Sequence, residues 1–252
     1  MCAYEELTAE PLWQSIDFIS DLHLQASEPE TFNAWQRYMQ TTPADAVFIL
    51  GDLFEVWVGD DVLNEHGFDD QCAHVIQQTG ARMPVFFMHG NRDFLIGPGL
   101  MAACNTTLLV DPTVLSFNQQ RWLLSHGDAL CLDDADYMQF RQQVRSTDWQ
   151  QTFLAKPLAE RQAIARGLRQ QSEARKDSGA TYADVDAQAA RLWLEQANSP
   201  TLIHGHTHKP ASHDLGQGLQ RVVLSDWDMA ATPPRAEVLR LSAQGLQRIA
   251  LT

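Results

Sequence analysis

Five short apolar segments of this chain each run into residues that bind metal ions in proteins. The segments and the residues that follow them are 16–20 with Asp21 and His23, 46–51 with Asp52, 84–90 with Asn91, 122–125 with His126, and 201–205 with His206 and His208. Runs of this length that are rich in β-branched and aromatic residues are typical of buried strands. Because sites in open α/β sheets form outside the carboxyl ends of strands, the pattern predicts seven ligands at one edge of one sheet.

The chemistry of these seven side chains favours a pair of divalent ions. Carboxylate, amide and imidazole ligands without a thiolate suit Mn²⁺, Fe, Zn²⁺ or Mg²⁺. Seven ligands exceed the needs of one catalytic ion, but they suffice for two ions if one carboxylate bridges them. Ions paired at ~3.5–4 Å serve phosphoester hydrolysis by holding a hydroxide and clamping phosphoryl oxygens. A lone buried histidine is more often structural, so His66, His74, His89 and His213 are expected to be structural and His204 to orient a neighbouring ligand.

Size and charge narrow the class of protein further. The chain has 252 residues and 44% hydrophobic content, which fits one large domain or one domain with a sizeable insertion. The sequence has no apolar run near the ~18 residues that span a bilayer and no secretory signal pattern at its start, so a cytoplasmic location is expected. The net charge of −14 argues against binding to nucleic acid.

Strand and helix patterns alternate along residues 16–128, which favours an α/β fold. From about residue 133 to residue 195 the strand signal stops and apolar residues recur at helical spacing. The pattern predicts a core formed by residues 14–132 and 198–252, with a helical cap formed by residues 133–197. Within this stretch, residues 141–176 contain eight basic and three acidic side chains. Such a basic patch favours binding to an anionic ligand or to a membrane surface. The alternative is a solvated helix face, and the charge alone does not distinguish the two interpretations.

The ligand blocks together resemble the calcineurin-like metallophosphoesterases. The matching blocks are Asp21-Leu22-His23, Gly51-Asp52, Gly90-Asn91-Arg92-Asp93, His126-Gly127 and Gly205-His206-Thr207-His208. The resemblance implies a β-sandwich flanked by helices. It also implies one metal bound by Asp21, His23, Asp52 and His208, and a second bound by Asp52, Asn91, His126 and His206.

One departure from the superfamily pattern bears on the substrate. Most members have histidine where this chain has Arg92. Arginine grips phosphate bidentately but is a poor proton donor. This favours a leaving group that needs little protonation, such as one phosphate of a pyrophosphate. Arg92 is therefore expected to bind the substrate phosphate and stabilise the transition state, with Asp93 supporting a neighbouring ligand.

The Arg92 version of the third block, together with residues 51–61 and 203–210, resembles a branch of the superfamily that hydrolyses a UDP-linked diacylated glucosamine in lipid A biosynthesis. This resemblance implies two Mn²⁺ ions per chain, a cap over the site, and a peripheral position on the cytoplasmic face of the inner membrane, with no obligate protein partner. The implied catalytic residues are Asp52, Asn91, Arg92 and His126. The implied substrate-binding residues are Asn91, Arg92, Asp134, Ser172, Lys176 and His206.

Three questions stay open in the sequence. Phe140, Phe153, Leu154 and Leu158 either line an acyl groove or pack the cap against the core. The substrate is either the acylated nucleotide or a soluble nucleotide cleaved by a pyrophosphatase or phosphodiesterase. A metal-poor scaffold with the same fold is the alternative outside enzymes, and the intact ligand set counts against it.

Overall fold

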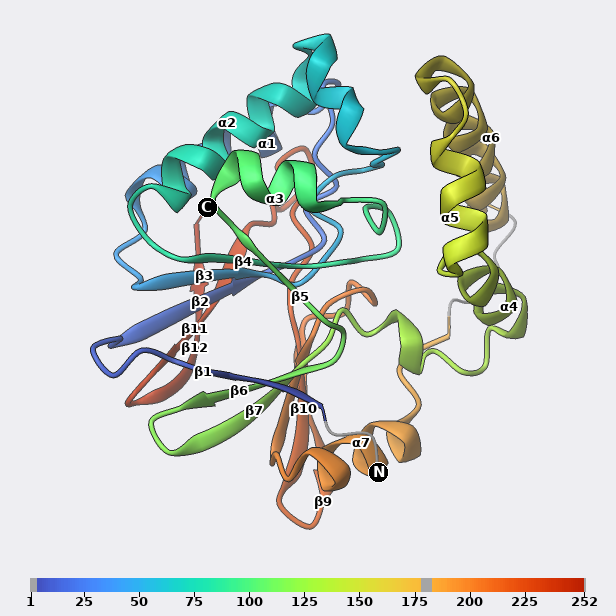
Figure 1. The fold of residues 1–252 in the computed structure, drawn as a ribbon. Coiled ribbons are helices and arrows are strands. Elements are labelled where there is room, and N and C mark those ends of the chain that lie inside the picture. Colours follow the sequence, from blue (N-terminus) through green and yellow to red (C-terminus); the bar gives the residue numbers. More distant parts are fainter. Residues whose placement is uncertain (1–3, 178–182, 252) are drawn as a thin grey trace.

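The structure is a computed structural model that describes residues 4–177 and 183–251, without the side chains of residues 171–177. Its centre is a sandwich of two six-stranded β-sheets with helices on the outer faces (Figure 1). The expected α/β sandwich is confirmed by this arrangement.

The first sheet has the strand order β12-β11-β2-β3-β4-β5. Its strands are β2 (Ser15–Ile19), β3 (Ala46–Ile49), β4 (Val85–Met88), β5 (Thr107–Leu109), β11 (Glu237–Ser242) and β12 (Gly245–Ala250). Strands β2 to β5 run parallel, and β11 adds antiparallel to β2. Every residue of β3 and β4 is buried, as expected of parallel strands covered on both faces.

The second sheet has the strand order β1-β6-β7-β8-β10-β9. Its strands are β1 (Glu5–Thr8), β6 (Thr113–Phe117), β7 (Gln120–Leu124), β8 (Thr201–His204), β9 (Ala211–Gly216) and β10 (Leu219–Val223). Strands β7 and β8 are parallel neighbours, with Trp122 opposite Thr201.

The prediction that one sheet delivers all seven ligands was wrong. Strands β2, β3 and β4 belong to the first sheet, whereas β7 and β8 belong to the second. The ligand residues therefore lie where the two sheets end side by side, at one end of the sandwich. An apolar run identifies a buried strand, but it does not say which strands pair with it, and this is why the sequence pattern could not separate the two sheets.

Apolar side chains fill the space between the two sheets. Phe48 and Phe86 of the first sheet stack with ring centroids 4.5 Å apart, and Leu124 and Ile203 of the second sheet belong to the same buried cluster. Three helices, α1 (Pro29–Thr41), α2 (Phe68–Gly80) and α3 (Pro98–Cys104), cover the outer face of the first sheet (Figure 1). This packing makes the strands rigid, so the residues at their ends are held in fixed positions.

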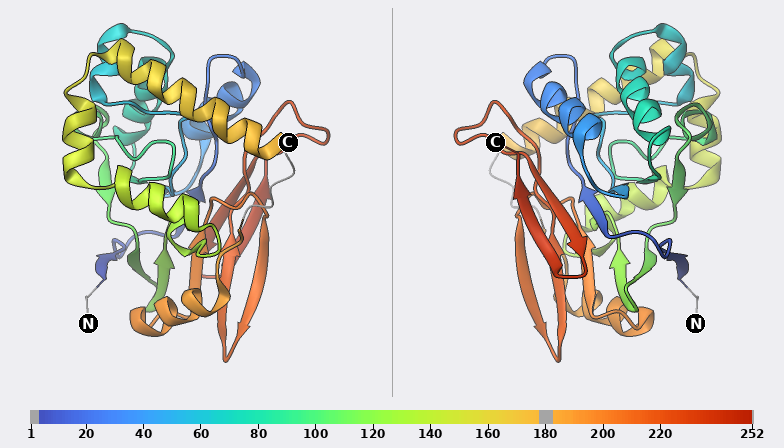
Figure 2. Two further views of the ribbon diagram at one scale, coloured as in Figure 1. Left: turned by 90° about the vertical axis from the view of Figure 1, so that its right-hand side faces the viewer. Right: turned by 90° about the vertical axis from the view of Figure 1, so that its left-hand side faces the viewer.

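The cap consists of three helices on one side of the sandwich: α4 (Ala135–Val144), α5 (Thr147–Leu154) and α6 (Leu158–Asp177). Figure 2 shows α6 crossing the same side of the molecule as α4 and α5. Two short 3₁₀ helices, η1 (Asp60–Glu65) and η2 (Asp128–Leu130), lie in core loops. In the described parts of the chain, no helix has both the length and the apolar character needed to cross a bilayer.

The predicted cap range of residues 133–197 also contains α7 (Ala187–Ala197), which the structure places elsewhere. Ala190 and Leu194 of α7 belong to a buried cluster with Leu123 and Leu202 of the second sheet. This helix covers the outer face of that sheet, away from α4 to α6 (Figure 1). Its apolar face needs a partner, and the uncovered sheet supplies one.

Candidate active site

The chain bends sharply where it leaves the strands. Five of the seven predicted ligands have a positive φ: Asp21 (56°), His23 (48°), Asp52 (53°), His206 (68°) and His208 (52°). A non-glycine residue in this region costs on the order of 1–3 kcal/mol and persists only when its surroundings enforce it. Five of the eleven non-glycine residues with positive φ in the described residues are therefore predicted metal ligands, and these turns direct their side chains into a common space.

The first group of side chains comes from the loops after β2 and β8. Ligand atoms of Asp21, His23 and His208 all lie within 4.8 Å of one another. The Nε2 atoms of His23 and His208 are 3.2 Å apart, and His208 Nε2 is 3.4 Å from Asp21 Oδ1. Asp52 approaches the same group, with its Oδ2 3.9 Å from His23 Nε2.

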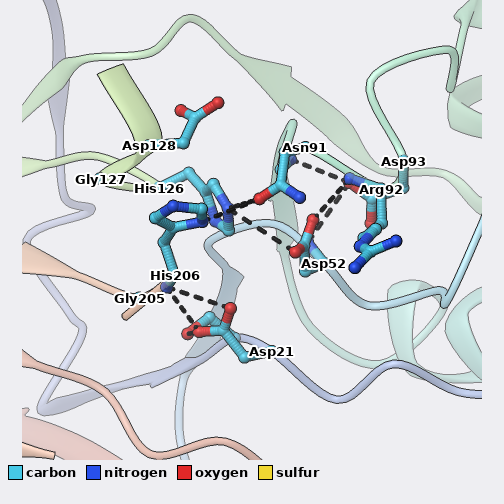
Figure 3. Close-up of polar contacts among 12 residues, drawn as sticks. Asp21, Asp52, Asn91, Arg92, Asp93, His126, Gly127, Asp128, Gly205 and His206 are labelled. Carbon is cyan, nitrogen blue, oxygen red and sulfur yellow. Dashed lines mark hydrogen bonds and ion pairs between the residues drawn. The ribbon is translucent and has the colours of Figure 1, made fainter. Parts of the chain in front are cut away.

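The second group gathers around Asn91, after β4 (Figure 3). Its Oδ1 lies 3.0 Å from His126 Nε2 and 2.8 Å from His206 Nδ1. Asp52 Oδ2 is 3.8 Å from His126 Nε2. Ligand atoms of Asp21, Asp52 and His126 lie within 4.8 Å of one another, so the two buried carboxylates stand between the groups. The structure therefore brings all seven predicted ligands together.

The electrostatics of this space suit cations. Burial alone would lower the pKa of His126, but the carboxylates of Asp52 and Asp128 outweigh it and raise that pKa to about 9. Asp21 and Asp52 are both buried, at 0% and 2% exposure. Buried carboxylates of this kind require positive charge nearby, and the hard oxygen and imidazole donors fit divalent ions. The residues present therefore fit a pair of divalent metal ions.

Asp93 supports the Asp52 loop from beneath. Its Oδ2 accepts a hydrogen bond from the backbone N–H of Leu53 at 2.9 Å, and its Oδ1 accepts from Gly90 at 2.8 Å and Asp52 at 3.3 Å. Burial and the neighbouring Asp52 carboxylate raise the pKa of Asp93 to about 7. The side chain acts on backbone groups of two strand ends, and in this way it sets where the Asp52 carboxylate points.

Arg92 is held beside Asp52 by its backbone. Its N–H donates to Asp52 Oδ1 at 2.8 Å, and its carbonyl accepts from the N–H of Trp57 at 3.0 Å. The side chain is 22% exposed, and its Nη1 lies 3.9 Å from Glu55 Oε1. The guanidinium group is thus partly open at the edge of the ligand cluster, where a substrate phosphate could reach it.

Basic residues of the cap pair with acidic residues of the core. These pairs are Arg141 with Asp128 (Nε to Oδ2, 2.8 Å), Arg169 with Glu55 (Nε to Oε1, 3.3 Å) and Arg161 with Asp61. Part of the basic patch predicted from the sequence therefore holds the cap to the core, an outcome that neither sequence interpretation included. Asp128 is fully buried and also accepts a hydrogen bond from the hydroxyl group of Tyr137 at 2.7 Å. The Tyr137 ring stacks on His206, with centroids 5.9 Å apart.

The structure places the other predicted substrate contacts in different settings. Asp134 is the N-cap of α4, where its Oδ1 accepts from the backbone N–H of Tyr137 at 3.0 Å. Ser172 and Lys176 lie in α6, among the residues whose side chains fall outside the described part of the structure.

The four apolar cap residues divide between packing and exposure. Phe153 is buried with the core cluster that includes Trp57, and Leu158 packs against it. Phe140 and Leu154 are 38% and 42% exposed. The first two therefore fasten the cap to the core, and the second two face solvent.

Asp226 is a neighbour of the ligands that the sequence did not reveal. Its Oδ2 lies 3.9 Å from Nδ1 of His208, and Arg235 binds the same carboxylate with Nη2 to Oδ2 at 2.7 Å. The adjacent Trp227 donates its backbone N–H to the carbonyl of Asp21 at 3.1 Å. The only sequence signal was the dense run Ser225-Asp226-Trp227-Asp228, for which no function was predicted.

Comparison with known proteins identifies the family. Residues 15–210 match the calcineurin-like phosphoesterase family, and the chain belongs to it. The UDP-2,3-diacylglucosamine hydrolase of Chromobacterium violaceum is 47% identical over 222 residues, covering 84% of this chain and 90% of that protein. The protein of the same name from Bordetella pertussis is 40% identical over 245 residues, covering 94% of this chain and 93% of that protein. The solved structure of an archaeal phosphodiesterase covers 94% of this chain and 99% of its own, with 12% identity and a TM-score of 0.46.

Proposed function

We propose that this chain hydrolyses the pyrophosphate of UDP-2,3-diacylglucosamine to UMP and 2,3-diacylglucosamine 1-phosphate, a step of lipid A biosynthesis. The observation that carries the proposal is the complete ligand cluster with Arg92 at its edge, held through Asp52 at 2.8 Å. The names and high identity of the two relatives support the same activity and substrate.

The residues of the cluster bind the metal ions, and Arg92 binds the substrate phosphate. Asp21, His23, Asp52 and His208 would hold one divalent ion, and Asp52, Asn91, His126 and His206 the other, which we propose to be Mn²⁺. When bound, such a pair supplies an activated water and offsets charge on the phosphoryl oxygens. Arg92 grips the phosphate and stabilises the charge that develops as the uridine-side phosphorus is attacked. The departing sugar phosphate needs little protonation, so a permanent cation serves better here than a proton donor.

A groove between core and cap supports an acylated substrate. It measures about 220 Å³ and is lined by Val56, Trp57, Val58, Val62, Asp69, Gln162 and Arg166. One lining residue, Trp57, donates its backbone N–H to the Arg92 carbonyl at 3.0 Å. The apolar wall of Val56, Trp57, Val58 and Val62 suits part of an acyl chain.

The direct test is the release of UMP from UDP-2,3-diacylglucosamine by the purified protein loaded with Mn²⁺. We expect turnover of this substrate to exceed that of soluble UDP-sugars and dinucleotides, and chelation of the metal to abolish it. A folded, metal-loaded protein that releases no UMP would contradict the proposal. Strong turnover of soluble dinucleotides without preference for the acylated substrate would favour the pyrophosphatase alternative, and failure to bind Mn²⁺ would favour the scaffold.

We further propose that the chain works in the cytoplasm, peripherally attached to the inner membrane through its cap. Leu132, Phe140, Leu154 and Leu168 on or beside the cap are 38–47% exposed, and exposed apolar side chains near basic residues favour binding to an anionic bilayer. Replacing Phe140 and Leu154 with serine is expected to reduce co-sedimentation with phosphatidylglycerol vesicles. Leu12→Ser provides the control, because Leu12 is 83% exposed but lies outside the cap. Equal losses in both proteins would contradict this attachment.

A further inference from the structure

Glu55 is a largely buried carboxylate among three positively charged or ionisable groups. It follows Asp52 by three residues, and its backbone N–H donates to the carbonyl of Leu24 at 3.2 Å. Its side chain is 13% exposed. This backbone contact ties the segment to the loop that carries His23, so the position of the carboxylate is fixed from both sides.

The two oxygens of Glu55 face different partners. Oε2 lies 3.2 Å from Nδ1 of His23. Oε1 lies 3.3 Å from Nε of Arg169 and 3.9 Å from Nη1 of Arg92. One carboxylate therefore touches a predicted metal ligand, the predicted phosphate-binding residue and the longest helix of the cap, α6.

The orientation of the His23 ring shows how its contact with Glu55 bears on metal binding. Its Nε2 faces the ligand cluster, 3.2 Å from His208 Nε2, so Nδ1 points outward to Glu55. The Nδ1 atom is buried, and the Glu55 carboxylate faces it at 3.2 Å. A carboxylate behind a metal-binding imidazole fixes the ring and raises its basicity as a ligand.

A second ion pair between core and cap holds α6 in place without contacting the predicted ligands. Asp61 binds Arg161 of the same helix α6, and Arg161 is 2% exposed and also donates to the carbonyl of Val58. Asp61 belongs to η1, in the same stretch of core chain as Glu55. This pair fastens α6 without touching any predicted ligand, so attachment of the cap does not by itself require Glu55.

We propose that Glu55 is a positioning residue that couples the cap to the metal centre. It holds His23 for one of the two ions and aligns Arg92 and Arg169 at the same edge of the site. Its effect on Arg92 rests on the pyrophosphate hydrolysis proposed above, whereas its effect on metal binding does not.

The test compares Glu55→Gln with Asp61→Asn, two changes that each remove one negative charge facing α6. Mn²⁺ affinity is measured by calorimetry without substrate, and kcat and KM are measured separately for UDP-2,3-diacylglucosamine. We expect Glu55→Gln to weaken binding of one of the two ions about 10- to 100-fold, the range for groups that support metal ligands. Excess Mn²⁺ should restore part of kcat. Asp61→Asn should keep both Mn²⁺ affinities and alter at most KM and the melting temperature.

Two further variants separate the contacts of Glu55. Arg169→Gln removes the contact between Glu55 and the cap, together with the hydrogen bond from Arg169 Nη1 to Gln25 Oε1 at 3.0 Å, and leaves the Glu55–His23 contact in place, so it should raise KM and leave Mn²⁺ affinity unchanged. Glu55→Asp keeps the charge on a shorter side chain and should recover part of the lost affinity. Wild-type Mn²⁺ affinity in Glu55→Gln, or an equal loss in Asp61→Asn, would overturn the proposal. Absence of UMP release by the wild-type protein would instead overturn the proposed substrate and leave the metal result standing.

Discussion

Alanine at position 90 is expected to abolish most of the activity by displacing Asp52. A Cβ atom on Gly90 would lie 2.1 Å from Asp52 Oδ1 and 2.4 Å from the Asp52 backbone nitrogen. Neither atom can yield easily, because Asp52 is buried and its loop is bound by Asp93. A misplacement of about 1 Å at such a group costs on the order of 100-fold in rate. We expect kcat/KM to fall about 100-fold and Mn²⁺ affinity to fall with it, as measured by kinetics and calorimetry.

Gly167→Ala is the matched control for Gly90→Ala. Gly167 lies within α6, and a Cβ there meets nothing within 4 Å. Alanine in a helix interior is expected to stabilise the protein by about 0.5–1 kcal/mol and to leave catalysis unchanged. If Gly90→Ala bound two ions and turned over substrate like the wild type, the close approach of the Gly90 and Asp52 loops would be irrelevant to the site.

Arg92→His, which restores the residue common in the superfamily, is expected to lower kcat/KM for the pyrophosphate substrate about 100- to 1,000-fold. Loss of one charge-stabilising donor has an effect of this order. The loss should be smaller for a soluble phosphodiester with an alkoxide leaving group, because histidine can donate the proton that such a group requires. The measurement is the ratio of kcat/KM for the two substrates in each protein.

Arg37→His controls for the change of residue type, because Arg37 is exposed on α1, which covers the far face of the first sheet. It should leave both substrates unaffected. An equal loss on both leaving groups in Arg92→His would show that Arg92 binds phosphate without selecting the kind of leaving group.

The positions of the ligands are predictable from the sequence because each lies within four residues of a strand end. Buried strands are recognisable from their apolar runs, and their carboxyl ends are places where side chains converge. The seven side chains do converge, although they come from two sheets. Strand pairing is a long-range property, so the division between β4 and β7 leaves no trace in local patterns.

The acidic residues that support the ligands could not be predicted from the sequence, because their roles also depend on long-range contacts. Glu55, Asp128 and Asp226 resemble ordinary surface acids when read along the chain. Each acquires its role from a partner distant in sequence, such as Arg169 for Glu55 and Arg141 for Asp128. The charge pattern showed that residues 141–176 are basic, but it could not show that acids of the core neutralise part of that charge.

The end of the cap was hard to place because α7 has the same amphipathic pattern as the helices before it. Periodicity reports that a helix has an apolar face, but not which surface covers that face. Helix α7 packs on the uncovered face of the second sheet, and this face exists only after β7, β8 and β10 have assembled.

The chain enters and leaves the cap at neighbouring points of the sandwich, so the cap can be exchanged as a unit. The backbone N–H of Asp186 donates to the carbonyl of Leu130 at 2.8 Å, so the chain leaves the sandwich and returns to it at one point. Because α7 stays on the sheet and Cys131 and Val185 belong to its buried cluster, residues 132–183 form the exchangeable segment, and a replacement must supply a cation for the buried Asp128 in place of Arg141. We expect a chain rebuilt in this way to keep its metal ligands and to change in the substrates that it accepts.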